Sequence, residues 1–214
     1  MRINQKSGLI IAVSGGPGTG KSTLVRQLAA AYGATALFEG EEKDFPEEVR
    51  VGIKTGQAQL ATRLYFRNKT FAQYVDALSR KAAGEIVILD NFWLVNEVCC
   101  HEFLHEPFER ELMTVATELD RQMFPWPDLI ISLKADAKKI EEFVTRRGRS
   151  FEINNDDFFA RYASIHAKHD EYLQSFQIDN VLYVDRSKMD FKSGGDLASL
   201  LVRIEEKLKS LGKI

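Results

Sequence analysis

One short segment, residues 15–22, restricts the folds open to this chain more than any other part of the sequence. It reads Gly-Gly-Pro-Gly-Thr-Gly-Lys-Ser and matches the phosphate-loop pattern, in which a Gly and four free positions precede Gly-Lys-Ser. An apolar run at residues 9–13 predicts a buried strand that leads into the loop. The apolar spacing from Leu24 to Tyr32 predicts a helix that leads out of it.

The chemistry of this segment follows from its backbone and two side chains. Glycines allow successive amides to point at one anion, and the helix behind them adds the positive end of its dipole. Lys21 is placed to reach the β and γ phosphates of a nucleotide, and Ser22 to offer its hydroxyl to Mg²⁺. The strand and the helix on either side disfavour an accidental glycine-rich turn. We therefore predict an ATP-binding loop made of Gly15, Gly16, Pro17, Gly18, Thr19, Gly20, Lys21, Ser22 and Thr23.

The rest of the chain alternates short apolar runs with longer helical patterns. Runs that predict buried strands lie at residues 9–13, 35–38, 85–90, 129–133 and 181–184. Helical spacing of apolar residues includes residues 56–83, 109–123 and 156–176. In the second of these helices we expect Leu112, Met113, Ala116 and Leu119 to face inward. The alternation predicts an α/β fold, with one parallel sheet covered by helices on both faces and residues 1–214 forming a single domain.

Composition excludes several classes of function. Charged residues make up 28% of the chain but the formal net charge is only -2, which argues against a nucleic-acid or membrane partner that binds a broad charged surface. The N-terminal apolar run is too short for a signal peptide or a membrane span. The two cysteines, Cys99 and Cys100, are neighbours, and neighbours rarely form a structural disulfide. We therefore expect a reducing compartment, the cytoplasm.

Charged side chains follow several of the predicted strands and helices. Glu39 comes just after the second strand, and Asp90 closes the third, on the edge where open α/β sheets hold ligands. An Asp at that place in a phosphate-loop protein helps to hold Mg²⁺. Arg146, Arg147 and Arg149 surround one glycine. They form either an ordinary basic helix end or a lid that closes over a transferring phosphoryl group.

A competing motif lies at residues 101–105. His-Glu-Phe-Leu-His matches the zinc-protease pattern, in which two His one helical turn apart bind the metal and the Glu acts as base. Catalytic zinc needs a third protein ligand, and nothing marks Glu118 or Asp120 as one. We therefore interpret this segment as an ordinary helix. We interpret His166 and His169 as residues of a helix face rather than metal ligands.

The order of these parts resembles that of the deoxynucleoside kinases over nearly the whole chain. The more specific similarities are Glu39, residues 118–131, residues 147–152 and the ending at residues 181–191. The resemblance implies a five-stranded sheet in the order 2-3-1-4-5. It also implies transfer of the γ-phosphoryl group of ATP to the 5′-hydroxyl of a deoxyribonucleoside, and it makes a homodimer a common assembly for such a chain.

The resemblance also implies roles for single residues. Glu39 would be the general base, and Asp90 would help to hold Mg²⁺. Arg147 and Arg149 would belong to a lid at about residues 146–155. Glu152 would reach the sugar 3′-hydroxyl, and the segment near Asp185 would border the adenine of ATP.

The departures from the family pattern concern the acceptor. The family carries Asp-Arg-Ser or Glu-Arg-Ser after the third strand, whereas this chain has Asp90-Asn91-Phe92. Arg63 stands where a base-reading Gln is usual, and Gln73 gives a rival alignment. Arg offers only hydrogen-bond donors and prefers anions. We therefore expect the acceptor to be an unusual nucleoside, a nucleotide or another small anionic molecule. In a nucleoside monophosphate such as thymidylate, Arg63 or Arg67 would bind the phosphate. A third alternative is a regulatory protein that binds ATP without transferring phosphate.

Overall fold

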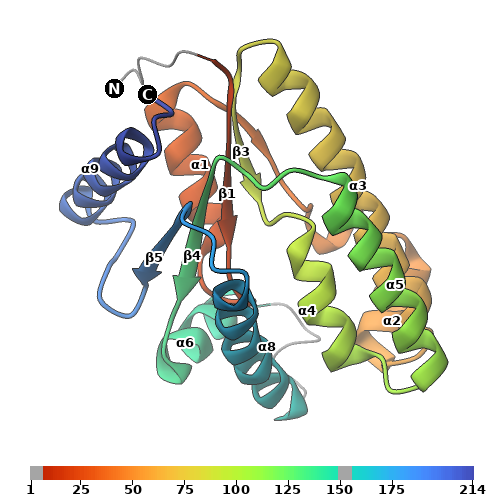
Figure 1. The fold of residues 1–214 in the computed structure, drawn as a ribbon. Coiled ribbons are helices and arrows are strands. Elements are labelled where there is room, and N and C mark those ends of the chain that lie inside the picture. The colour runs from red at the N-terminus through yellow and green to blue at the C-terminus, as the bar shows by residue number, and fades with distance from the viewer. Residues whose placement is uncertain (1–6, 149–155) are drawn as a thin grey trace.

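The computed structural model describes residues 7–148 and 156–214, and in the second range it describes side chains from residue 162 onward. Within these residues the chain forms one parallel sheet in the order β2-β3-β1-β4-β5, which confirms the predicted order. The strands are β1 (Leu9–Ser14), β2 (Thr35–Leu37), β3 (Ile86–Asp90), β4 (Leu129–Lys134) and β5 (Val181–Asp185). Because all of them run the same way, their carboxyl ends meet at one edge of the sheet (Figure 1).

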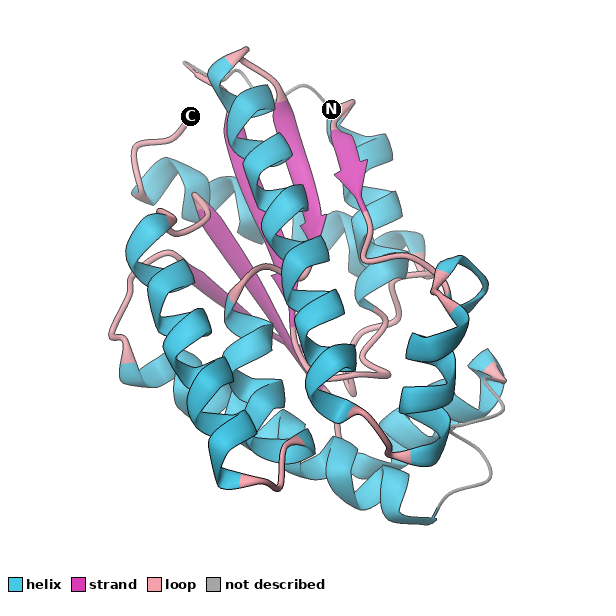
Figure 2. Cartoon of the chain, turned by 90° about the vertical axis from the view of Figure 1, so that its right-hand side faces the viewer, coloured by secondary structure: helices cyan, strands magenta, loops and turns pink. Residues whose placement is uncertain are grey.

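Helices cover both faces of this sheet, as the alternation of patterns predicts (Figures 1 and 2). The helical segments are α1 (Lys21–Tyr32), η1 (Glu42–Asp44), α2 (Glu47–Thr55), α3 (Gln59–Ala82), α4 (Leu94–Phe103), α5 (Pro107–Met123), α6 (Ala137–Arg147), α8 (Asp156–Ser175) and α9 (Gly194–Ser210). None of the described helices combines the length and the apolar composition needed to cross a lipid bilayer.

The two faces of the sheet follow directly from the side-chain alternation of the strands. Leu9, Ile11 and Val13 of β1 pack with α1 and α9 in one core, whereas Ile10 and Ala12 pack with α3, α8 and the start of α4 in the other. Every residue of β1 and β3 is buried, as expected for central strands of a sheet with two covered faces. The two apolar cores therefore lie on the faces of the sheet, and the polar residues lie at the carboxyl ends of the strands.

The predicted orientation of α5 is wrong for two residues. Leu112 is 38% exposed and Leu119 is 50% exposed, whereas Met113 is buried. The side chains of α5 that are buried are Met113, Thr117 and Asp120. Asp120 faces inward because its carboxylate accepts hydrogen bonds from Arg67 of α3 at 2.8 and 2.5 Å. An ion pair between distant residues thus overrides the apolar spacing of the helix.

A buried carboxylate links several elements at the amino ends of the strands, the edge opposite the carboxyl ends. Asp128, just before β4, accepts the Ile10 amide of β1 at 2.9 Å. It also pairs with Lys81 at the end of α3 and Lys213 near the C-terminus, both at 2.7 Å. Burial alone would raise the pKa of Asp128, but the hydrogen bonds from Lys213, Lys81 and Ile10 outweigh it and lower the pKa below its usual value. This carboxylate therefore joins β1, α3 and the end of the chain.

Asp128→Asn is expected to lower the free energy of unfolding by about 1–3 kcal/mol near neutral pH, because it removes the charge that two lysines share. A lowered folded-state pKa stabilises the protein above the unfolded pKa of about 3.9, and this contribution is lost as pH falls through the folded value. Urea unfolding at pH 7 and at successively lower pH measures the effect. The exposed Asp179→Asn is the control. This prediction would be contradicted if the difference in free energy of unfolding between the parent protein and Asp128→Asn did not decrease as the pH is lowered.

Candidate functional site

The phosphate-loop segment connects the end of β1 to the start of α1 at the carboxyl edge of the sheet. Gly20, the residue that precedes α1, has φ 84° and ψ 21°, a left-handed conformation that glycine adopts without strain. A Cβ at Gly16 would lie 2.5 Å from the ring of His166, so a larger residue has no room there. The Thr19 hydroxyl donates to the Gly16 carbonyl at 2.9 Å and closes the turn. These contacts fix the path of the loop.

Lys21 sits at the mouth of this loop. Its ammonium donates to the carbonyls of Gly15 and Gly16 at 3.0 and 2.9 Å. Burial lowers the pKa of Lys21, and the nearby carboxylates of Asp90 and Glu39 act in the opposite direction. The ammonium thus lies near two carboxylates and beside the loop amides that can hold an anion.

Ser22 and Asp90 form a pair of oxygen groups beside Lys21. The Ser22 hydroxyl donates to Asp90 Oδ2 at 2.5 Å. The register of the sheet explains the contact, because β1 and β3 pair Val13 with Asp90 and so bring the end of β3 beside the loop. A hydroxyl and a carboxylate are hard oxygen ligands, and this pair suits Mg²⁺ bound next to phosphates.

Two cavities meet at these residues. The larger has a volume of about 1140 Å³ and lies along the loop and the ends of α6 and β5. The smaller has a volume of about 420 Å³ and extends between α3, α4 and α8. Lys21, Ser22, Asp90 and Arg147 line both, whereas Glu39 lines only the smaller one and is half-buried. Two separate molecules can therefore meet across one set of charged groups.

The smaller cavity is lined by a partly buried cation, Arg63. The Arg63 guanidinium carbon lies 4.2 Å from the centre of the Phe103 ring, and the Nε atom has no hydrogen-bond partner among the described residues. Burial lowers the pKa of Arg63, and Cys99 and Glu39 partly offset this effect. Asn96 also lines the cavity, and its side-chain nitrogen has no partner within the described part of the chain. This wall offers hydrogen-bond donors.

Several predicted residues lie elsewhere. The Gln73 amide donates to the Phe38 carbonyl at the end of β2, and Arg67 is held by Asp120. The Asp185 carboxylate accepts the Ser187 amide at 3.1 Å. None of the three is among the described residues that line either cavity. Arg149 and Glu152 fall outside the residues that the structure describes.

Two histidines that the sequence places on a helix face contact the loop and the strand end that leads into it. His166 Nε2 donates to the Pro17 carbonyl at 2.8 Å, and His169 Nε2 lies 2.6 Å from the Ser14 hydroxyl. Burial lowers the pKa of His166 to about 4, so its ring is neutral near pH 7. Only the packing of α8 against the loop shows this role, because the spacing of three residues also fits a solvated face.

The zinc-protease pattern does not have the geometry its chemistry needs. The helix α4 ends at Phe103, and Leu104 is extended, so His105 lies beyond the helix that carries His101. Glu102 pairs with Lys168 of α8. Within residues 7–148 and the described part of 156–214, no group of three His, Cys, Asp or Glu side chains is placed to hold a metal ion.

Comparison with known proteins supports the sequence resemblance. The model of a family described as AAA domain matches residues 10–188. A deoxyadenosine kinase from Lactobacillus acidophilus is 23% identical over 216 residues, which cover 96% of this chain and 99% of that protein. The structure of a deoxyadenosine kinase from M. mycoides with products dCMP and dCDP bound has a TM-score of 0.74 and 16% identity, with 92% of this chain and 100% of that chain covered. A thymidylate kinase from Candida albicans has a TM-score of 0.68 and 16% identity, with 96% and 94% covered.

Proposed function

The chain belongs to the AAA-domain family, and from that premise we propose that it is an ATP-dependent kinase that phosphorylates the 5′-hydroxyl of a deoxyribonucleoside. The observation that carries this proposal is the meeting of two cavities at Lys21, Ser22 and Asp90. Transfer between two bound molecules requires their reacting groups to be aligned where negative charge is neutralised. The similarity to the deoxyadenosine kinases of L. acidophilus and M. mycoides supports the nucleoside as acceptor.

The larger cavity is the proposed place of ATP. The amides of residues 15–22 and the Lys21 ammonium would bind the β and γ phosphates. Ser22 and Asp90 would hold Mg²⁺, which when bound neutralises charge on the phosphate oxygens. Arg147, which lines both cavities, and Arg149 would add positive charge over the transferring group.

The smaller cavity is the proposed place of the acceptor. Glu39 lines it in the neighbourhood of Lys21 and Asp90, where a 5′-hydroxyl would face the γ phosphate. Its carboxylate would take the hydroxyl proton during transfer. Arg63 and the ring of Phe103 would contact the base, and Glu152 would reach the 3′-hydroxyl. Gln73 holds the carbonyl of Phe38, next to Glu39, and would act on the acceptor only through that strand end.

Glu39→Gln is expected to lower kcat by about 10²- to 10⁴-fold, because an amide cannot accept the hydroxyl proton. The affinities for ATP and for the acceptor should stay close to those of the parent protein, since the amide has nearly the same shape. A coupled assay of ADP formation and calorimetric titration measure the two quantities. Glu48→Gln, at an exposed position in the first turn of α2, is the matched control. Normal turnover by Glu39→Gln would refute the assignment of the base.

One observation favours a second acceptor class. Arg63 is a partly buried cation whose Nε atom has no hydrogen-bond partner among the described residues, and such a group suits the phosphate of a nucleoside monophosphate. The similarity of the fold to a thymidylate kinase fits the same alternative. Arg67 does not supply this charge, because it is engaged by Asp120.

Arg63→Gln separates the two acceptor classes. If Arg63 reads a base, we expect the acceptor KM to rise by about tenfold or the base preference to change, while the KM for ATP is retained. If Arg63 binds a phosphate, parent turnover should be confined to monophosphates, and the variant should lose it. A coupled assay across nucleosides and monophosphates measures both, with the exposed Arg50→Gln as control. Turnover of monophosphates alone by the parent would reject the nucleoside acceptor, and ATP binding without any transfer would favour the regulatory alternative.

We also propose that the protein is a homodimer. Five apolar side chains, each between 38% and 73% exposed, follow one stripe of α5 at helical spacing: Phe108, Leu112, Val115, Leu119 and Met123. A stripe of this kind is costly to leave in water, and a second copy of the chain would cover it. The free thiols of Cys99 and Cys100 support the cytoplasm as the compartment in which the protein works.

Val115→Glu combined with Leu119→Glu is expected to shift the protein from dimer to monomer, because two charges would be buried in the shared surface. Sedimentation equilibrium measures this shift. Val202→Glu, at an equally exposed apolar position on α9, should leave the assembly unchanged. A parent protein that sediments as a monomer would remove the dimer from the proposal.

A further inference from the structure

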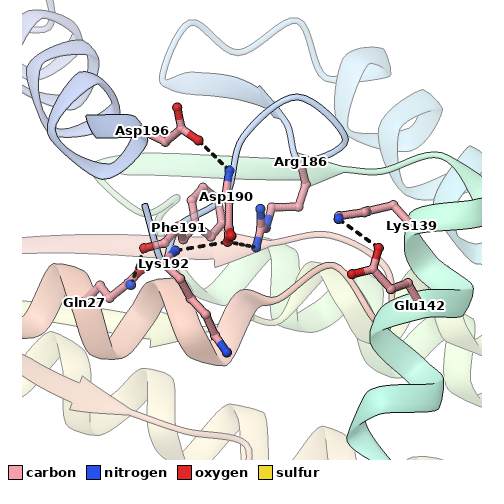
Figure 3. A network of polar contacts seen from close by, with 8 residues as sticks. All are labelled: Gln27, Lys139, Glu142, Arg186, Asp190, Phe191, Lys192 and Asp196. Carbon is pink, nitrogen blue, oxygen red and sulfur yellow. Dashed lines mark hydrogen bonds and ion pairs between the residues drawn. The ribbon is translucent and has the colours of Figure 1, made fainter. Parts of the chain in front are cut away.

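Arg186, the first residue after β5, is a buried cation that the site described above does not use. Arg186 is only 3% exposed. The backbone is fixed, because the Arg186 amide donates to the Lys134 carbonyl at the end of β4 at 2.7 Å. Figure 3 shows the side chain running from the residue after β5 towards Asp190. The position of the guanidinium is therefore set by the sheet edge.

Two aromatic rings hold the guanidinium in place. Its central carbon lies 4.8 Å from the centre of the Phe143 ring and 4.2 Å from that of Phe191. The Phe191 carbonyl in turn accepts a hydrogen bond from Gln27 of α1 (Figure 3). The contacts around Arg186 thus connect α6, α1 and the segment after β5. Because rings already pack against the guanidinium, its remaining binding capacity is in its N–H groups, which lie in the guanidinium plane.

Most of these N–H groups have no partner. Arg186 Nε and Nη1 are buried and make no hydrogen bond to any described residue. Nη2 makes one long contact of 3.4 Å with Asp190, whose side chain is 64% exposed and also accepts the Lys192 amide. A buried guanidinium keeps its proton, so these unmade hydrogen bonds destabilise the protein. An apolar side chain would fill the space between the rings without that cost, so packing alone does not explain an arginine here.

The unpaired nitrogens lie beside the phosphate-loop segment. A Cβ at Gly20 would be 3.5 Å from Arg186 Nε, and Gly20 immediately precedes α1, where free helix amides favour an anion. Arg186 lines the larger cavity together with Gly18, Gly20 and Lys21. Arg146 and Arg147 at the end of α6 line it as well. The surroundings of Nε and Nη1 are those of a site for phosphate oxygens.

We propose that Arg186 binds the phosphate chain of the donor nucleotide through Nε and Nη1, as a second fixed cation of the larger cavity beside Lys21. The proposal rests on the proposed function only in that a nucleotide occupies this cavity, and it does not depend on the acceptor. Phe143, which holds the guanidinium, lies on the helix that carries Arg146 and Arg147. Phosphate bound at Arg186 therefore rests against the helix that carries these two arginines.

Arg186→Met and Arg186→Lys test this role by calorimetric titration in the presence of Mg²⁺. The probes are ATP, GTP and inorganic tripolyphosphate, which has neither base nor sugar. Arg186→Met is expected to weaken all three by a similar factor, about 10- to 100-fold, because charge-assisted hydrogen bonds to phosphate are lost. Arg186→Lys should restore part of the loss. In steady-state kinetics the KM for the donor should rise while the KM for the acceptor stays unchanged.

Arg203→Met is the matched control, since Arg203 also contacts β5, through the Tyr183 carbonyl, but is not among the described residues of the larger cavity. Melting temperatures without ligand show whether each variant is folded. If Arg186→Met does not fold, the affinities of Arg186→Lys for the three probes test the proposal. Unchanged affinity for ATP and tripolyphosphate would overturn the proposal. So would a loss confined to ATP, because that pattern belongs to a base contact. A parent protein that binds ATP but phosphorylates no acceptor would reject the kinase and leave this test intact.

Discussion

The site depends on the close packing of the phosphate-loop segment against its neighbours. A Cβ at Gly16 would lie 2.5 Å from the ring of His166 on α8, and one at Gly18 would lie 2.9 Å from Val144 on α6. No side chain fits at either place, so the two helices fix the path of the loop. These helices come on either side of residues 149–155 in the chain. A movement of α6 or α8 would therefore shift the loop amides that would hold a phosphate.

The same site concentrates partly or fully buried positive charge in a chain whose net charge is -2. Lys21 and Arg63 have no carboxylate within ion-pair distance in the part of the chain that the structure describes, and Arg186 has only a long contact with the exposed Asp190. By contrast, Arg67 is fully engaged by Asp120. Cations withdrawn from water without an ion-pair partner destabilise a fold, whereas an anionic ligand bound to them stabilises it. The presence or absence of an ion-pair partner therefore distinguishes cations that stabilise the fold, such as Arg67, from cations that are available to a ligand.

The strands, their order and the loop could be predicted from sequence because they depend on local signals. Apolar runs, glycines and the Gly-Lys-Ser pattern carry that information without reference to distant residues. The parts that sequence reasoning missed depend on distant pairs. Asp120 turns α5 only because Arg67 meets it, and His166 belongs to the site only because α8 packs on the loop. Arg186 likewise reads as an ordinary charged residue after a strand until the two rings around it are seen.

The departure at Asp90-Asn91-Phe92 has a physical consequence for the acceptor. Phe92 is 1% exposed and packs edge-on against Trp93, with ring centres 5.4 Å apart, so it belongs to the core under the cavity. Asn91 has φ 72°, a conformation that Asn tolerates better than a long side chain, and it lines the smaller cavity. The position where the resemblance places an arginine is thus short and neutral. Arg63 on α3 lines the same cavity as Asn91, so this cavity takes a positive charge from a different element of the fold.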